Sequence, residues 1–149
     1  MNKRKAVLMV VAAVSVLALC GMFFLNDLIL LGMVNGLKSA VKKNPQVQLV
    51  ETQSVCGKIN GNGNGIQYFG AVLIKSDDET AVKALLEELK GEYEEVGYCV
   101  QAGQNIRSSY LEHQTLSYDH DSFQDATYYS IYFYNSHSNL SNPLDLRGH

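Results

Sequence analysis

The stretch that decides the architecture is residues 3–25, which read KRKAVLMVVAAVSVLALCGMFFL. Three basic residues precede an apolar run over residues 6–25 that only Ser15, Cys20 and Gly21 interrupt. A helix rises 1.5 Å per residue, so this run spans about 30 Å, the thickness of the hydrocarbon core of a bilayer. A helix also satisfies its backbone hydrogen bonds internally, as lipid requires. The sequence therefore predicts a transmembrane helix over residues 6–25, so the membrane is an expected partner of the chain.

Two other uses of an apolar N-terminal segment compete with an uncleaved signal anchor. Val16 and Ala18 fit the small-residue rule for signal-peptide cleavage, although the mature chain would then begin with large apolar residues. The residues around Cys20 resemble a lipid-attachment motif, but Leu19 stands where a small residue is expected. An uncleaved anchor leaves none of these features unexplained. We therefore expect residues 1–26 to be a basic start followed by a signal anchor.

The orientation of the anchor follows from the basic residues at its two ends. Lys3, Arg4 and Lys5 lie directly before the apolar run, whereas the first lysine after it is Lys38. Positive charge close to a span favours the cytoplasmic side. We expect a single-pass protein whose C-terminal domain is extracytoplasmic.

The remaining chain divides into three parts. Residues 27–44 predict a juxtamembrane helix that either prolongs the span or lies at the interface, and it ends before Pro45 because proline disfavours a preceding helical residue. Residues 45–135 form the expected α+β domain, and residues 136–149 a polar C-terminal tail.

The expected fold is a small antiparallel sheet of order β-β-α-β-β-β with one helix packed on one face. Alternating or β-branched residues predict strands over residues 46–56, 66–75, 98–102, 110–118 and 127–135. Apolar residues at helical spacing predict a helix from Ser76 to Val96, in which Ser76 and Glu79 fit a capping box. Gly91, inside this helix, marks a possible earlier end.

The charge balance disfavours a nucleic-acid partner. From Asp27 onward the chain has 9 basic and 15 acidic residues, a net charge of −6 that repels phosphate backbones. No phosphate-loop or dinucleotide motif is present, so the sequence implies no cofactor.

Cys56 and Cys99 are candidates for a disulfide. Both fall at the edges of predicted strands, and an extracytoplasmic location would permit a bridge. The alternative is a pair of free thiols, and no C-x-x-C motif supports redox catalysis.

The run Asn60-Gly61-Asn62-Gly63-Asn64-Gly65 is a hairpin signal, because Asn-Gly pairs readily adopt positive φ. It is alternatively a ligand loop whose polar groups are Lys58, Asn60, Asn62 and Asn64. A strand follows where a phosphate loop requires a helix, which favours the hairpin.

Glu112, His113, Asp119, His120 and Asp121 are the candidate metal or acid–base groups. Glu112 and His113 would point to opposite faces of a strand, and aspartates are common in turns for backbone reasons. A solvated turn is therefore favoured over a metal site at Asp119, His120 and Asp121.

Nine tyrosines and no tryptophan occur in the chain. Tyr128, Tyr132 and Tyr134 line one face of a single predicted strand. An exposed set would suit a binding surface for a protein partner, whereas a half-buried sheet face is the simpler interpretation.

No convergent catalytic set stands out, so the sequence favours a non-enzymatic binding or accessory module on a membrane anchor. The alternative is a small membrane-tethered, metal-dependent hydrolase that uses His113, Asp119, His120 and Asp121.

Overall fold

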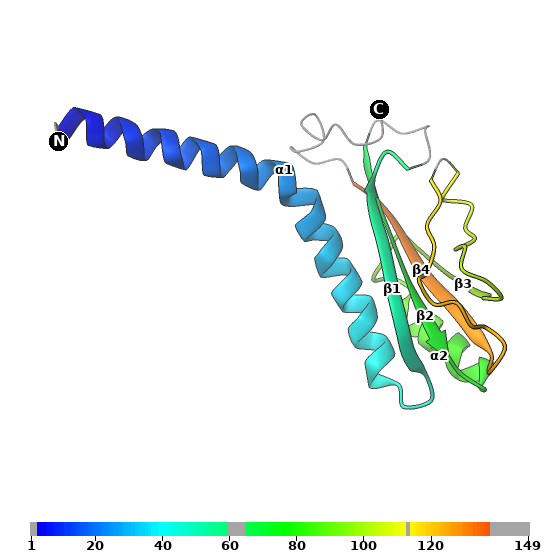
Figure 1. Ribbon diagram of the computed structural model, residues 1–149. Coiled ribbons are helices and arrows are strands. Elements are labelled where there is room, and N and C mark those ends of the chain that lie inside the picture. Colours follow the sequence, from blue (N-terminus) through cyan, green and yellow to red (C-terminus); the bar gives the residue numbers. More distant parts are fainter. Residues whose placement is uncertain (1–2, 60–64, 113, 138–149) are drawn as a thin grey trace.

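The computed structural model describes residues 3–59, 65–112 and 114–137 of the chain. Within these ranges the elements are α1 Lys3–Lys43, β1 Gln48–Gly57, β2 Ile66–Lys75, α2 Glu79–Leu89, β3 Glu95–Val100 and β4 Tyr128–His137. The strands form one four-stranded antiparallel sheet in the order β1-β2-β4-β3 (Figure 1). The α+β class and the antiparallel sheet are confirmed.

The sheet is buried on both faces around its central strands. In β2, Tyr68, Val72 and Ile74 belong to one hydrophobic core, while Phe69 and Leu73 belong to a second core on the opposite face. This alternation follows from the two-residue period of a strand. The predicted strand over residues 66–75 is confirmed as β2, a central strand with apolar residues on both faces.

The helix α1 is continuous from the basic start to Lys43, and its two halves have different surroundings. Figure 1 shows an N-terminal half that projects away from the sheet and a C-terminal half that lies along it. Leu30, Val34, Leu37 and Val41 recur every three or four residues and are buried in the first core. The segment expected as a juxtamembrane helix is therefore part of the domain core. Two helices cover this face of the sheet, and the expectation of one helix is corrected.

The helix α2 is shorter than the sequence predicted. It ends at Leu89, before Gly91, whose φ of +92° suits a residue without a side chain. The N-cap is Asp78, which accepts hydrogen bonds from the backbone N–H groups of Thr80 and Ala81. Ser76 instead donates its hydroxyl to the carbonyl of Gln46, so the capping box predicted there does not form.

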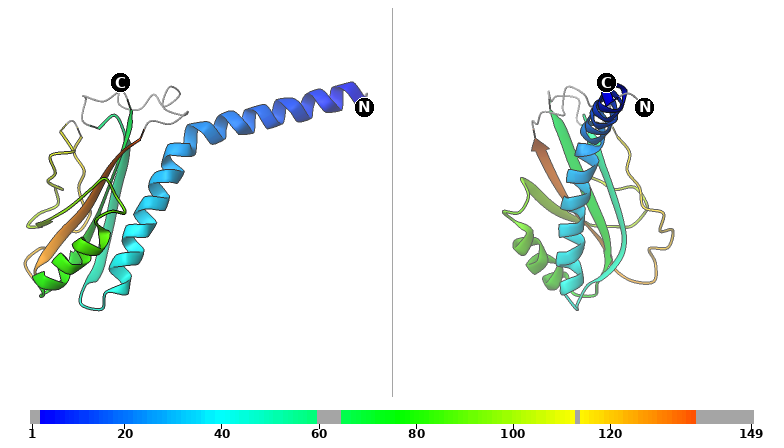
Figure 2. Two further views of the ribbon diagram at one scale, coloured as in Figure 1. Left: turned by 180° about the vertical axis from the view of Figure 1, so that it is seen from behind. Right: turned by 90° about the vertical axis from the view of Figure 1, so that its left-hand side faces the viewer.

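The second face of the sheet is covered by the irregular segment 101–127 (Figure 2). The predicted strand over residues 110–118 is wrong, because the described residues of this segment form only an isolated bridge between Asn105 and Ser117. Ile106, Leu111 and Tyr118 turn inward and join the second core. The apolar residues of this segment thus act as a cover and do not extend the sheet.

Candidate functional site

The N-terminal half of α1 presents an apolar surface with nothing packed against it. Its large side chains from Val7 to Leu19 are each 53–73% exposed, and Phe24 is 63% exposed. Leaving so many aliphatic side chains in water is unfavourable by about 25 cal/mol per Å² of apolar surface. This surface is the strongest functional feature in the described part of the chain.

Among the described residues, α1 is the one helix that is long and apolar enough to cross a membrane. By composition alone the segment Phe24–Lys43 meets this criterion, yet a third of it is buried in the domain. A helix that packs against a sheet on one side cannot also be surrounded by lipid. Residues 6–25, whose described large apolar side chains are exposed, are therefore the better candidate for a span.

A buried polar contact marks the point where α1 joins the domain. Asn26 is fully buried, and its Oδ1 accepts a hydrogen bond of 2.8 Å from the hydroxyl of Tyr68 in β2. In the next residue, the Asp27 carboxylate accepts from the Cys56 thiol at 3.6 Å. Buried polar groups need such partners, so these contacts fix where the helix meets the sheet. No sequence pattern indicates this contact, since Asn26 is the last residue of the predicted anchor, residues 1–26.

The expected disulfide does not form, and both Cys56 and Cys99 are free thiols. Cys56 lies in β1 and Cys99 in β3, which are the two outer strands of the sheet. Three strand spacings separate them, about 14 Å, whereas bridged Cα atoms lie within about 7 Å. Burial raises the pKa of the Cys99 thiol, although the nearby Arg107 guanidinium opposes this.

The predicted tyrosine face is mostly covered. Tyr128 and Tyr134 are buried, and Tyr132 is partly buried under the segment 101–127. Tyr134 stacks on Tyr110 with ring centroids 4.3 Å apart. Tyr118, from the covering segment, shares a buried hydrogen bond of 2.7 Å with Ser130, and its burial raises the pKa of its phenol. These tyrosines therefore form core, which agrees with the simpler interpretation of a half-buried sheet face and not with the alternative of an exposed binding surface.

The turn at Asp119, His120 and Asp121 is held by Glu51 of β1. The Glu51 carboxylate accepts hydrogen bonds of 2.9 Å from the backbone N–H groups of Asp119 and His120. Burial opposes ionisation of Glu51, but these bonds and one from Gln53 outweigh it, so the pKa of Glu51 is lowered. The His120 ring packs edge-on against Phe123.

No group of three His, Cys, Asp or Glu side chains with metal-binding geometry occurs within residues 3–59, 65–112 and 114–137. Nearby Asp125 is occupied by Lys75 at 3.0 Å and by the hydroxyl of Tyr128 at 2.7 Å. His113 lies outside the described residues, as do Asn60, Asn62 and Asn64 of the possible ligand loop, whereas Lys58 is described and half-buried. The hairpin and ligand-loop interpretations both stay predictions.

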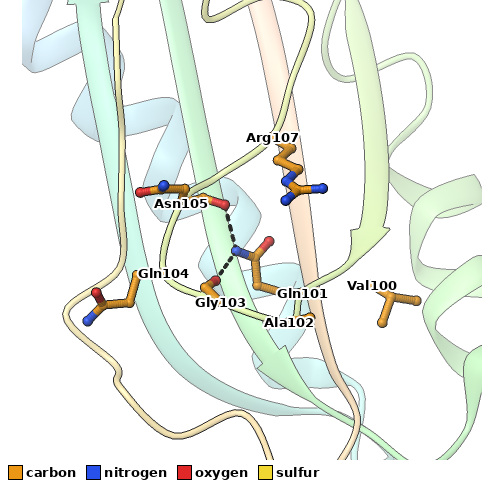
Figure 3. Close-up of a pocket in the computed structure, with 7 residues that line it drawn as sticks. All are labelled: Val100, Gln101, Ala102, Gly103, Gln104, Asn105 and Arg107. Carbon is orange, nitrogen blue, oxygen red and sulfur yellow. Dashed lines mark hydrogen bonds between the residues drawn. The ribbon is translucent and has the colours of Figure 1, made fainter.

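A cavity of about 280 Å³ lies at the end of β3, lined by residues 100–105 and Arg107. Figure 3 shows the Gln101 carboxamide inside the loop, where its Nε2 donates to the carbonyls of Gly103 and Asn105. No carboxylate forms an ion pair with Arg107 among the residues that the structure describes. This site was not predicted from the sequence, where its one signal is that Arg107 is the only lysine or arginine between Lys90 and Arg147.

Comparison of the chain with protein-family models, with curated proteins and with solved structures finds no match.

Proposed function

We propose that this chain is a single-pass membrane protein whose α+β domain is a non-enzymatic binding or accessory module. Residues 6–25 hold the domain at the extracytoplasmic surface of the membrane. The observation that supports the anchor best is the exposure of the apolar side chains along the N-terminal half of α1. The domain has two cores of its own that use none of these side chains, so the exposed half has no role in the fold.

The orientation rests on the basic residues before the span. Lys3, Arg4 and Lys5 adjoin the apolar residues directly, whereas Lys38, Lys42 and Lys43 come more than ten residues after Leu25. Positive charge within about 15–20 residues of a span contributes to its orientation, and we give the directly adjoining residues the most weight. The N-terminus is therefore cytoplasmic.

A membrane fractionation of cells that express the full chain tests the anchor. The protein is expected in the membrane pellet after carbonate washing, with an intact mass that includes the N-terminal residues. Recovery of the intact chain in a detergent-free supernatant would contradict the proposal. A shortened mass beginning after Ala18, or a lipid adduct at Cys20, would identify a cleaved signal peptide or a lipoprotein.

Topology is tested separately with reporters fused after His149. A reporter active only outside the cytoplasm is expected to work, while one active only in the cytoplasm is expected to fail. The reverse result would place the domain in the cytoplasm and leave the anchor itself intact.

A non-enzymatic module is favoured because the carboxylates next to the turn at residues 119–121 are engaged in structural bonds. Glu51 supports the turn at Asp119 and His120, and Asp125 bonds to Lys75 and Tyr128. We expect the purified full chain to contain no stoichiometric metal. Metal that is present in the wild type and lost in the His113→Ala and His120→Ala variants would favour the hydrolase instead.

For a small ligand, the chemistry of the described residues favours the cavity beside Arg107. Its guanidinium, which lies beside the Gln101 carboxamide in Figure 3, is a fork of hydrogen-bond donors that matches a carboxylate. A thermal-shift screen with small carboxylates tests this assignment. Stabilisation of the wild type that disappears in Arg107→Gln is expected, and an equal shift in both proteins would contradict the assignment.

A further inference from the structure

The side of α1 that faces away from the sheet stays apolar beyond the proposed span. Leu28 is 60% exposed and Leu31 is 55% exposed, although both belong to the half of the helix that packs on the domain. The exposed Gly32, Asn35, Ser39 and Lys42 continue the same side at spacings of three or four residues. We call this side the outer face of α1; it starts apolar next to the span and ends basic.

The charge of this region is opposite to that of the rest of the domain. Residues 28–50 contain three lysines and no acidic residue, whereas residues 51–149 contain 6 basic and 14 acidic residues. Lys42 and Lys43 are exposed and Lys38 is half-buried. An anionic surface would therefore attract the outer face of α1 and repel the remainder of the domain.

The direction of the N-terminal half places the outer face next to the bilayer. Figure 1 shows this half leaving the domain on the side of the sheet that α1 covers, and the view from behind in Figure 2 agrees. Viewed from that side, the C-terminal half of α1 lies in front of the sheet (Figure 2, right). If the N-terminal half crosses a bilayer, the C-terminal half runs along its surface with the outer face toward lipid.

We propose that the outer face of α1 rests on the anionic headgroups of the bilayer that residues 6–25 cross. Leu28 and Leu31 enter the boundary between headgroups and acyl chains, as the apolar side of an interfacial helix does. Lys38, Lys42 and Lys43 lie about 10–20 Å further along the helix and contact lipid phosphates. This inference rests on the proposed membrane anchor and adds a lipid class and a fixed orientation of the domain.

A second copy of the chain is a less suitable occupant of the outer face. In a twofold contact between antiparallel helices, the lysine end of one copy would lie against the leucine end of the other. Each charged lysine would then lose water next to apolar side chains, which is costly without a paired charge. Anionic lipid suits both ends of the outer face, because its acyl chains can contact the leucines and its phosphates can contact the lysines.

The absence of tryptophan from the chain allows a direct test in vesicles. Full-length Leu31→Trp and Val100→Trp each carry one tryptophan at a position where the native apolar side chain is exposed, 55% and 64% respectively. Val100 ends β3, away from α1. In vesicles of phosphatidylglycerol and phosphatidylcholine, brominated acyl chains are expected to quench Leu31→Trp and to leave Val100→Trp unquenched. Equal fluorescence of Leu31→Trp with and without bromine would overturn the proposal.

The lysines give a second readout on the wild-type protein. The rate of reductive methylation of Lys42 and Lys43 is divided by the rate for Lys83 and Lys90 of the same chains. A difference in the amount of protein inserted into the two kinds of vesicle then cancels. The attraction of one lysine to an anionic surface corresponds to about a fivefold change in an equilibrium constant. The relative methylation rate of Lys42 and Lys43 should therefore be about fivefold lower in phosphatidylglycerol than in phosphatidylcholine vesicles. Equal relative rates in the two lipids would overturn the role of the lysines.

Flotation of the same vesicles separates the two proposals. If the protein floats with vesicles but neither tryptophan quenching nor lysine protection occurs, the anchor stands and the surface contact is wrong. Protein that does not float contradicts the anchor itself. Protection of the lysines that is equal in both lipids, without bromine quenching, would identify a second copy on the outer face and overturn the lipid contact.

Discussion

At the scale of single residues, the contact between Asn26 and Tyr68 joins the proposed anchor to the sheet. Both residues are fully buried, so their hydrogen bond is shielded from water. Tyr68→Phe removes the hydroxyl and keeps the ring, and should lower the free energy of unfolding by about 1–2 kcal/mol. Urea unfolding in a mild detergent, followed by circular dichroism, measures this change.

The matched control is Tyr98→Phe. The Tyr98 hydroxyl donates to Glu79 at an exposed position, so its loss should change the free energy of unfolding by less than about 0.5 kcal/mol. Equal effects of the two variants would show that burial of the Asn26 contact adds nothing to stability.

Tyr93 predicts how stability depends on alkaline pH. Its ring stacks on Phe133 and its hydroxyl donates to the carbonyl of Met33, and burial raises its pKa to about 12 with help from the charge of Glu92. The unfolded phenol titrates near pH 10, so the folded state binds the proton more tightly. This contribution to stability is complete below about pH 10 and is lost as the pH rises toward about 12.

The variant Tyr93→Phe should therefore lose stability less steeply than the wild type between these pH values. Tyr118, Tyr129 and Tyr132 also have raised pKa values, so part of the alkaline loss remains in the variant. Urea unfolding of both proteins at pH 8, 10 and 11 gives the two slopes. Parallel slopes would mean that Tyr93 ionises as freely in the folded protein as in the unfolded chain.

At the scale of elements, α1 and β2 pack closely at Gly70. A Cβ at this position would overlap the Phe133 ring and lie 3.0 Å from Cγ2 of Val34 in α1. Gly70→Ala should therefore destabilise the domain by about 1–3 kcal/mol, because the core must move to admit one methyl group. Thermal unfolding measured by circular dichroism tests this prediction.

The control is Gly32→Ala, on the exposed side of α1. Nothing lies within 4 Å of a Cβ at Gly32, and alanine favours helix over glycine by about 1 kcal/mol. This variant should be as stable as the wild type or more stable. If both variants were destabilised, close packing at Gly70 would not explain the loss of stability in Gly70→Ala.

The elements that the sequence predicted well have patterns that depend on local geometry. The alternating and β-branched residues of 66–75 predicted the strand β2 with the correct residue range. The segment 110–118 failed because Ile106, Leu111 and Tyr118 fill a core face whose need for a cover is a property of the tertiary structure. Likewise, no local pattern places Cys56 and Cys99 on opposite edges of the sheet, since strand order depends on pairing between distant segments.

At the scale of the whole molecule, the length of α1 follows from two roles, one in the domain core and one proposed in the membrane. Residues 27–43 complete the core through Leu30, Leu37 and Val41, whereas none of the described side chains of residues 6–25 belongs to either core. The apolar run alone predicts the second role, which is the proposed membrane span. The first was missed because the buried residues of α1 adjoin a transmembrane pattern, and the sequence does not mark where lipid contact ends and protein contact begins.

This division predicts opposite results for two truncations. A chain of residues 26–149 keeps Asn26 and every α1 residue of the core, so it should be soluble without detergent and unfold cooperatively. A chain of residues 44–149 lacks Leu30, Val34, Leu37 and Val41, and should aggregate, because losing one large buried side chain already costs about 2–5 kcal/mol. Size-exclusion chromatography and thermal unfolding compare the two. A well-folded 44–149 chain would show that α1 is only an anchor, and an insoluble 26–149 chain would show that residues 1–25 are needed to fold the domain.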